Sequence, residues 1–76
     1  LFMSMDKRLA IFLLDESVRT ESDNIKLTHG QIAKYIGSAR EVVSRMLKYF
    51  ANEGIVSVSR SGIKIIDKEC LRTLTL

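Results

Sequence analysis

The sequence predicts a mainly α-helical fold that carries one small β-hairpin. Three stretches place apolar residues at helical spacing, near residues 5–18, 28–36 and 39–52. Glycines follow the last two stretches, at Gly37 and Gly54. After Gly54 the apolar period changes from about 3.6 residues to about 2, as in paired strands. A helical core followed by a hairpin is therefore expected.

Size and composition indicate one small folded domain spanning residues 1–76. Of its 76 residues, 46% are hydrophobic, a fraction that argues against disorder. Twelve lysines and arginines against nine acidic residues give a net charge of +3. This mild positive charge permits a phosphate backbone as partner but does not require one.

Several other classes lack the residues that they need. One cysteine, Cys70, cannot form an intrachain disulfide, and one histidine, His29, leaves too few ligands for a structural zinc. No apolar run of about 18 residues could span a membrane, and no signal peptide is visible. A reducing, cytoplasmic setting is expected. Catalysis is not expected, because no carboxylate pair or glycine-rich phosphate loop accompanies the lone histidine and cysteine.

The first predicted helix runs from Met5 to about Val18, with Ser4 as its N-cap. Its wide apolar stripe predicts a largely buried helix without a chemical role. The polar, turn-forming residues 19–24 predict a loop. Residues 25–27 alternate apolar, polar and apolar, which predicts a very short strand at a sheet edge.

The second and third predicted helices are joined by a tight turn. Thr28 and Gln31 have the spacing of a capping box, which predicts a helix that reaches about Ile36. Gly37 is expected to end it in the left-handed conformation that glycine adopts without penalty. The third helix is expected over about residues 39–52.

The last third of the chain predicts a hairpin and a short helix. Strands alternate over residues 56–66, and residues 60–62 are expected to form the turn. Asp67 is a candidate N-cap for a helix from Lys68 to about Leu74. A helix pair followed by a two-stranded hairpin is the layout of a winged helix-turn-helix, with a three-helix core and a wing.

The third helix divides lengthwise into two faces. Its core stripe contains Val43, Met46, Leu47 and Phe50. Its polar face contains Arg40, Glu41, Ser44, Arg45 and Lys48. Arginine can bond both G O6 and G N7 in the major groove of DNA, and glutamate can accept from C N4. A Glu41–Arg45 surface pair is the plain alternative to base contact.

The spacing of small residues favours DNA binding over that alternative. Ala33 lets the two helices cross closely, Gly37 makes the sharp turn, and Val43 fills the space beneath the crossing. The polar face, this spacing and the basic hairpin tip together predict a DNA-binding unit. The residues expected at phosphates are Ser38, Lys48, Arg60, Ser61 and Lys64. A solvated hairpin without DNA contact is the alternative for the wing.

Residues 6–74 resemble the C-terminal DNA-binding domain of Crp/Fnr-type bacterial transcription regulators. The most specific part is the run Ile36-Gly37-x-x-Arg40-Glu41-x-Val43-Ser44-Arg45-x-Leu47, followed by Glu53-Gly54-Ile55. The resemblance implies an N-terminal sensor domain, which would bind any effector, so no cofactor is expected in residues 1–76. It also implies a homodimer on a near-palindromic site, with residues 1–5 as the remnant of the link. RNA polymerase is a further partner that the family allows.

The resemblance also implies roles for individual residues. Those matching Arg40 and Arg45 contact G, the one matching Glu41 contacts C, and Thr28 lies at a phosphate-contacting position. Family members often carry a hydroxyl where this chain has Ala39 and Val42. The phosphate contacts at those two positions are therefore expected to be missing. Together with Ser44, the residues at Arg40, Glu41 and Arg45 form the expected base-contacting set.

A second function class remains open, a winged helix that binds a protein partner and never DNA. Such a module would present an exposed apolar patch on the third helix. Val42, Met46 and Tyr49 form a second apolar line there. We expect that line to be mostly packed, which favours DNA binding.

Overall fold

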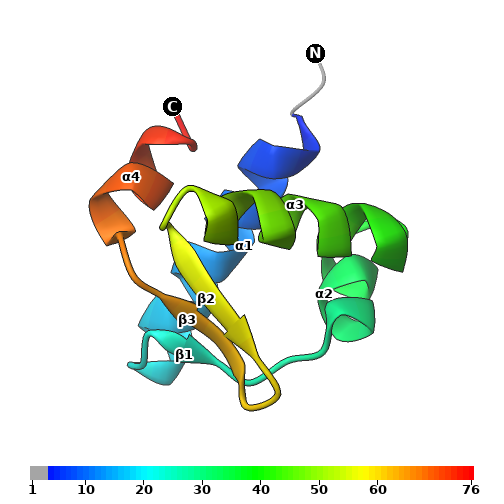
Figure 1. Cartoon of the computed structure of the whole chain (residues 1–76), viewed down its shortest axis with the longest axis horizontal. Coiled ribbons are helices and arrows are strands. Elements are labelled where there is room, and N and C mark those ends of the chain that lie inside the picture. Colours follow the sequence, from blue (N-terminus) through cyan, green and yellow to red (C-terminus); the bar gives the residue numbers. More distant parts are fainter. Residues whose placement is uncertain (1–3) are drawn as a thin grey trace.

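The structure, a computed structural model, describes residues 4–76. It contains α1 (Met5–Thr20), β1 (Asn24–Ile25), α2 (His29–Ile36), α3 (Arg40–Asn52), β2 (Val56–Ser59), β3 (Gly62–Ile65) and α4 (Lys68–Thr73) (Figure 1). The strands form a three-stranded antiparallel sheet of order β1-β3-β2, with α1 packed on one face and, among residues 4–76, no helix over the face turned to the viewer in Figure 1. This arrangement confirms the expected winged helix-turn-helix. Residues 1–3 of the expected link lie outside the described residues.

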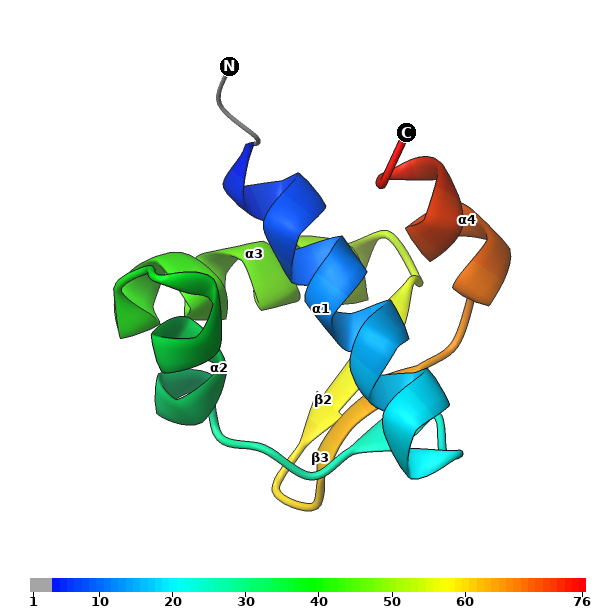
Figure 2. The same cartoon turned by 180° about the vertical axis from the view of Figure 1, so that it is seen from behind.

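Helix α1 packs against the face of the sheet and α3 that is hidden in Figure 1, and it lies in the foreground of Figure 2, where it supplies one wall of the core. Leu9 and Leu13 of the expected apolar stripe are fully buried, as is Ala10. The expectation of a largely buried helix is wrong, because the other residues of α1 except Ser17 are half-buried or exposed, and Val18, at the end of the stripe, is 77% exposed. Ser4 stands at the N-cap, but its side chain accepts no capping hydrogen bond. A hydrogen bond from the Ser4 side chain instead lowers the pKa of the Asp6 carboxyl.

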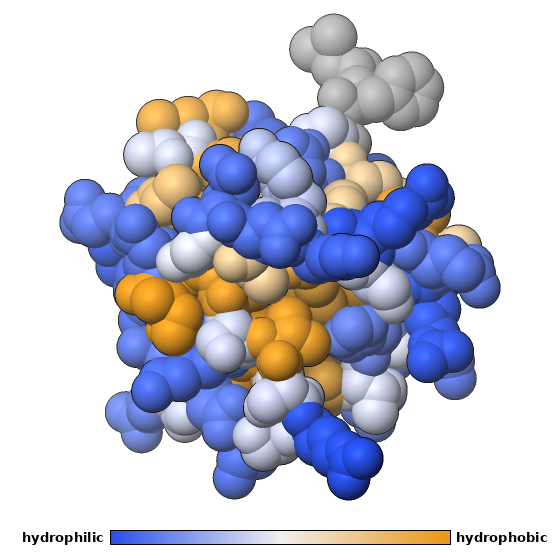
Figure 3. All heavy atoms as spheres, in the orientation of Figure 1, coloured by the Kyte–Doolittle hydropathy of each residue, from blue (hydrophilic) through white to orange (hydrophobic). Residues whose placement is uncertain are grey.

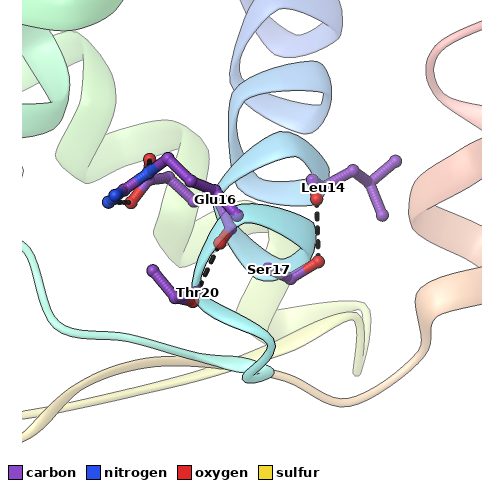
Figure 4. Close-up of polar contacts among 5 residues, drawn as sticks. Leu14, Glu16, Ser17 and Thr20 are labelled. Atoms are coloured by element: carbon purple, nitrogen blue, oxygen red, sulfur yellow. Dashed lines mark hydrogen bonds and ion pairs between the residues drawn. The ribbon is translucent and has the colours of Figure 1, made fainter.

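The C-terminal end of α1 is held by short-range side-chain bonds (Figure 4). The Arg19 guanidinium donates to both carboxylate oxygens of Glu16, at 2.8 and 2.9 Å. The hydroxyls of Ser17 and Thr20 donate back to the carbonyls of Leu14 and Glu16, each at 2.8 Å. The helix ends two residues beyond the expected Val18. There Glu21 adopts the left-handed conformation, with φ 54°, and its backbone N–H donates to the carbonyls of Ser17 and Val18, which would otherwise be unpaired.

The sheet is completed by a strand from before the helix pair. β1 occupies Asn24–Ile25, one residue earlier than expected, and it pairs with β3 through Asn24 to Lys64 and Ile25 to Ile63. β2 and β3 form the hairpin, with Ser59 opposite Gly62. Gly62 therefore begins β3 and does not belong to the turn, which contains two residues and not the three expected.

Helices α2 and α3 pack closely across the turn at Gly37. The glycine has φ 71° and ψ 45°, the expected left-handed conformation. Ala33 is buried where the helices meet, and Val43 is fully buried. The guanidinium of Arg8 on α1 donates to the carbonyl of Ile36 at 3.2 Å. This hydrogen bond links α1 to the end of α2, and it pairs the carbonyl of Ile36, which has no partner within its own helix.

Helix α4 closes the core from the hairpin side. Asp67 accepts a hydrogen bond from the backbone N–H of Cys70 at 3.0 Å, which confirms the predicted N-cap. Leu71 is fully buried, and Cys70 is half-buried and packs against the core. An ion pair of 2.7 Å joins Lys68 to Asp23 and so ties α4 to the segment before β1. Among residues 4–76, no helix is both long and apolar enough to cross a membrane.

Candidate nucleic-acid interface

Helix α3 presents a charged face to solvent. Arg40, Glu41, Arg45 and Lys48 are exposed. Val43, Leu47 and Phe50, on the opposite side, are at most 1% exposed. The ion pairs formed within residues 4–76 lie elsewhere in the fold, so Glu41 and Arg45 do not neutralise each other. The surface-pair alternative is therefore not what the structure shows, and both groups are free to bind a ligand.

Ser44 differs from its charged neighbours on α3. Its hydroxyl lies 2.8 Å from Nδ1 of His29, in the first turn of α2. Both side chains are half-buried. The serine expected to contact bases is thus already bonded to the neighbouring helix.

A cleft of about 700 Å³ opens between the start of α2, the start of α3 and the wing. Its lining residues are Lys26, Leu27, Thr28, His29, Gly30, Arg40, Ser59, Arg60, Ser61, Gly62 and Ile63. The cationic side chains among them are Lys26, Arg40 and Arg60, and the lining holds no carboxylate. A cavity with this charge suits an anionic strand.

Thr28 has a structural role at the rim of this cleft. Its hydroxyl oxygen accepts from the backbone N–H of Gln31 at 3.1 Å, and the Gln31 side chain accepts from the Thr28 backbone at 2.8 Å. The predicted capping box is therefore confirmed. Because the oxygen only accepts in this arrangement, the hydroxyl proton remains available to a phosphate.

The tip of the wing is a two-residue turn formed by Arg60 and Ser61. The hydroxyls of Ser59 and Ser61 lie 2.9 Å apart, which orders the serines on either side of Arg60. Lys64 is placed differently. It pairs with Ser57 and Asn24 in the middle of the sheet, and it is exposed between two buried isoleucines. Lys64 therefore lies on the outer face of the sheet and does not line the cleft.

The other two expected phosphate ligands also lie outside the cleft. Ser38 is half-buried in the turn between α2 and α3, where its backbone N–H donates to the carbonyl of Ala33 at 2.9 Å. Lys48 is exposed in the third turn of α3. The structure thus brings Thr28, Arg60 and Ser61 together but leaves Ser38, Lys48 and Lys64 separate.

Comparison with known proteins identifies the family. Residues 7–74 match the Crp-like helix-turn-helix domain. The chain belongs to this family. Its structure superimposes with a TM-score of 0.93 on a protein of Eubacterium rectale assigned to the Crp/Fnr family of transcriptional regulators, at 49% identity and over 95% of this chain and 33% of that one. The catabolite activator protein of Thermus thermophilus gives a TM-score of 0.83 and 27% identity, over 92% of this chain and 33% of that one.

A curated relative agrees with this assignment. The transcriptional regulatory protein Btr of Bordetella pertussis is 29% identical over 79 residues, which cover 95% of this chain and 33% of that protein. The chain therefore spans about a third of the length of Btr. Its family and its relatives make this Crp-like domain a DNA-binding domain of a transcription regulator.

Two ionisable side chains of the cleft in this Crp-like domain are absent from the set predicted from sequence. Lys26 lines the cleft two residues before the Thr28 cap, and His29 lines the cleft and bonds to Ser44. The alternation that buries Ile25 and turns Lys26 outward is a local signal that could have identified the lysine. The contact between His29 and Ser44 spans 15 residues of sequence and has no local signal.

The apolar line on α3 corrects one expectation. Val42 and Met46 are half-buried, and Met46 packs against the core as expected, but Tyr49 is 57% exposed, so the line is packed only in part. These three residues and Arg45 border a depression of about 280 Å³. The phenol ring of Tyr49 lies outside the core because Phe50, the next residue, takes the inward position.

The surface seen in Figure 3 is mainly hydrophilic above and around a central apolar area. That area lies below α3, over the hairpin. Val58 and Ile66 are the large exposed apolar residues of the hairpin segment. The charged face of α3 and this apolar area are therefore separate features of the Crp-like domain.

Proposed function

We propose that the domain binds double-stranded DNA sequence-specifically, with α3 in the major groove and the wing against the backbone. The observation that carries this proposal is the unpaired charged face of α3 beside a cationic cleft. The major groove is about 12 Å wide and accepts one α-helix. One duplex can then meet α3 through its bases and the cleft through its phosphates.

The residues take different tasks in this arrangement. Arg40 and Arg45 bond the O6 and N7 atoms of guanines, and Glu41 accepts from the amino group of a cytosine. Thr28 and the wing residues Arg60 and Ser61 bind phosphates. Ser38, Lys48 and Lys64 are candidate phosphate ligands farther along the backbone, outside the cleft.

Replacing Arg45 tests base contact. Arg45→Ala is expected to cost about 1–3 kcal/mol on the duplex selected from a random pool, and to relax the choice at one base pair. The measurement is equilibrium binding to the selected duplex and to single-base variants of it. Arg72→Ala, which removes the same charge from α4, is the matched control and should leave affinity unchanged. Equal losses on selected and random duplexes would rule out base contact by Arg45.

Replacing Arg60 tests the wing. Arg60→Ala is expected to weaken binding to all sequences alike and to lower the slope of log K against log salt concentration by about 0.9, the value for one phosphate contact. Affinity is measured on one duplex across a salt series. An unchanged slope would remove Arg60 from the phosphate contacts.

The wider assembly follows the family. We propose that two copies in the whole protein place two α3 helices on a near-palindromic site, and that any effector binds a separate sensor region. RNA polymerase contact and a cytoplasmic setting belong to the same proposal. A footprint of the whole protein on its selected site tests the symmetry, because a dimer protects two half-sites about 34–36 Å apart.

Protein binding is the second candidate, and exposed Tyr49 beside Val42 and Met46 favours it. The two candidates give different results with nucleic acid. Failure to bind any AT-rich or GC-rich duplex at low salt supports the protein-binding module. Binding that Tyr49→Ala leaves unchanged, and Arg45→Ala reduces, supports DNA recognition.

A further inference from the structure

The hydrogen bond between His29 and Ser44 joins the two helices of the DNA-binding unit at its outer side. The Nδ1 and Oγ atoms are 2.8 Å apart, and both side chains are half-buried. His29 also lines the cleft, whereas Ser44 does not. The imidazole therefore stands between the cleft and the charged face of α3.

The partner of the Ser44 hydroxyl is unusual for a serine inside a helix. Such hydroxyls commonly bond back to the carbonyl one turn earlier, as Thr20 does to Glu16 on α1. The hydrogen bond formed by the Ser44 side chain within residues 4–76 goes to His29 instead. The oxygen of the Ser44 hydroxyl is consequently held beside a residue of another helix.

We infer that His29 is a positioning residue that sets the hydrogen-bonding role of Ser44 toward a DNA base. This inference rests on the proposed function. A hydroxyl has one proton and two lone pairs. If Nδ1 accepts the Ser44 proton, the hydroxyl can only accept from a base amino group, on adenine or cytosine. If Nδ1 donates, the proton of Ser44 is free for a major-groove acceptor, which guanine, thymine and adenine N7 offer and cytosine does not.

The experiment compares base preference in three single variants with that of the wild-type chain. Selection from a random duplex pool with wild type and with Ser44→Ala identifies the base pair whose preference depends on Ser44. His29→Ala is expected to reduce discrimination at that same pair by about 2- to 10-fold, the usual range for one neutral hydrogen bond. His29→Asn places an amide atom at the position of Nδ1 and should restore most of it.

A combined variant separates positioning from direct contact. If His29 acts through Ser44, His29→Ala in the Ser44→Ala background changes base preference no further. A uniform loss on all duplexes, equal in both backgrounds, makes His29 a phosphate ligand and overturns the inference. A lower urea midpoint with base preference intact makes it a purely structural residue and also overturns it.

The result also distinguishes this inference from the proposed function. If wild type selects no sequence from the pool, the proposed function fails. If wild type selects a sequence but Ser44→Ala or His29→Ala leaves every base preference intact, only the positioning role fails.

Discussion

Replacing Gly62 by alanine should be one of the more damaging single changes outside the core. A Cβ at this position would lie 2.3 Å from the carbonyl oxygen of Ile25 and 3.1 Å from its carbonyl carbon. Both atoms are backbone, so a side-chain rotation cannot relieve the overlap. β1 would have to move away from β3, and the sheet would lose the strand that links it to the segment before α2.

The cost has two parts that can be bounded from the geometry. Gly62 has φ +133°, a conformation that L residues rarely adopt and that costs about 1–3 kcal/mol. The overlap adds a cost of the size seen for overpacking, about 1–3 kcal/mol. A total of about 2–6 kcal/mol is large beside the roughly 4–11 kcal/mol expected for the whole stability of a chain this size.

Gly37→Ala is the matched control. Gly37 also has a positive φ, +71°, but an added Cβ there would meet no atom within 4 Å. Only the strain remains, about 1–2 kcal/mol. Urea denaturation followed by far-ultraviolet circular dichroism measures both free energies of unfolding. If Gly62→Ala is no more destabilising than Gly37→Ala, the close approach of β1 to β3 is not a constraint on this sequence.

Two further pairs of substitutions test local bonds. Thr28→Ala removes the acceptor of the capping box and should lower the free energy of unfolding, measured by urea denaturation, by about 1 kcal/mol. Thr28→Ser keeps the hydroxyl and should lower it little. An equal loss in both variants would mean that the hydroxyl does not cap α2. The hydrogen bond from Arg19 lowers the pKa of Glu16, so this pair stabilises the fold above the usual glutamate pKa and the gain is lost as pH falls through the lowered pKa. Glu16→Gln should therefore flatten the acid side of a plot of Tm against pH, and Arg19→Gln should do the same. If the profiles of both variants have the same shape as that of the wild type, the pair contributes nothing to stability.

Local sequence patterns predicted most of the helical fold. The capping box at Thr28, the left-handed Gly37 and the N-cap at Asp67 each depend on residues within four positions of one another. β1 was misplaced by one residue because its position depends on β3, almost 40 residues later in the chain, and on the space left by Gly62. The end of α1 lies beyond the expected residue because it is set by the left-handed backbone of Glu21, which apolar spacing does not reveal.

The candidate site was only partly predictable for the same reason. The charged face of α3 follows from helical periodicity, since the burial of Leu47 and Phe50 turns Arg45 outward. The cleft is different, because residues 26–30, 40 and 59–63 come together only in the folded chain. Ser44 is an example. Its place on the polar face of α3 follows from the sequence, but its hydrogen bond to His29 on α2 does not.

The short wing has a consequence for how a complex would form. Its two tip residues are held between strands, and the central strand is paired on both sides. The backbone that carries Arg60 is therefore already ordered, and docking would immobilise mainly its side chain, at about 0.5–1.5 kcal/mol. A wing this short and ordered leaves little freedom in the distance between the backbone of Arg60 and α3. If Arg60 and α3 contact the same duplex, a duplex whose groove and phosphates do not match this distance would have to bend.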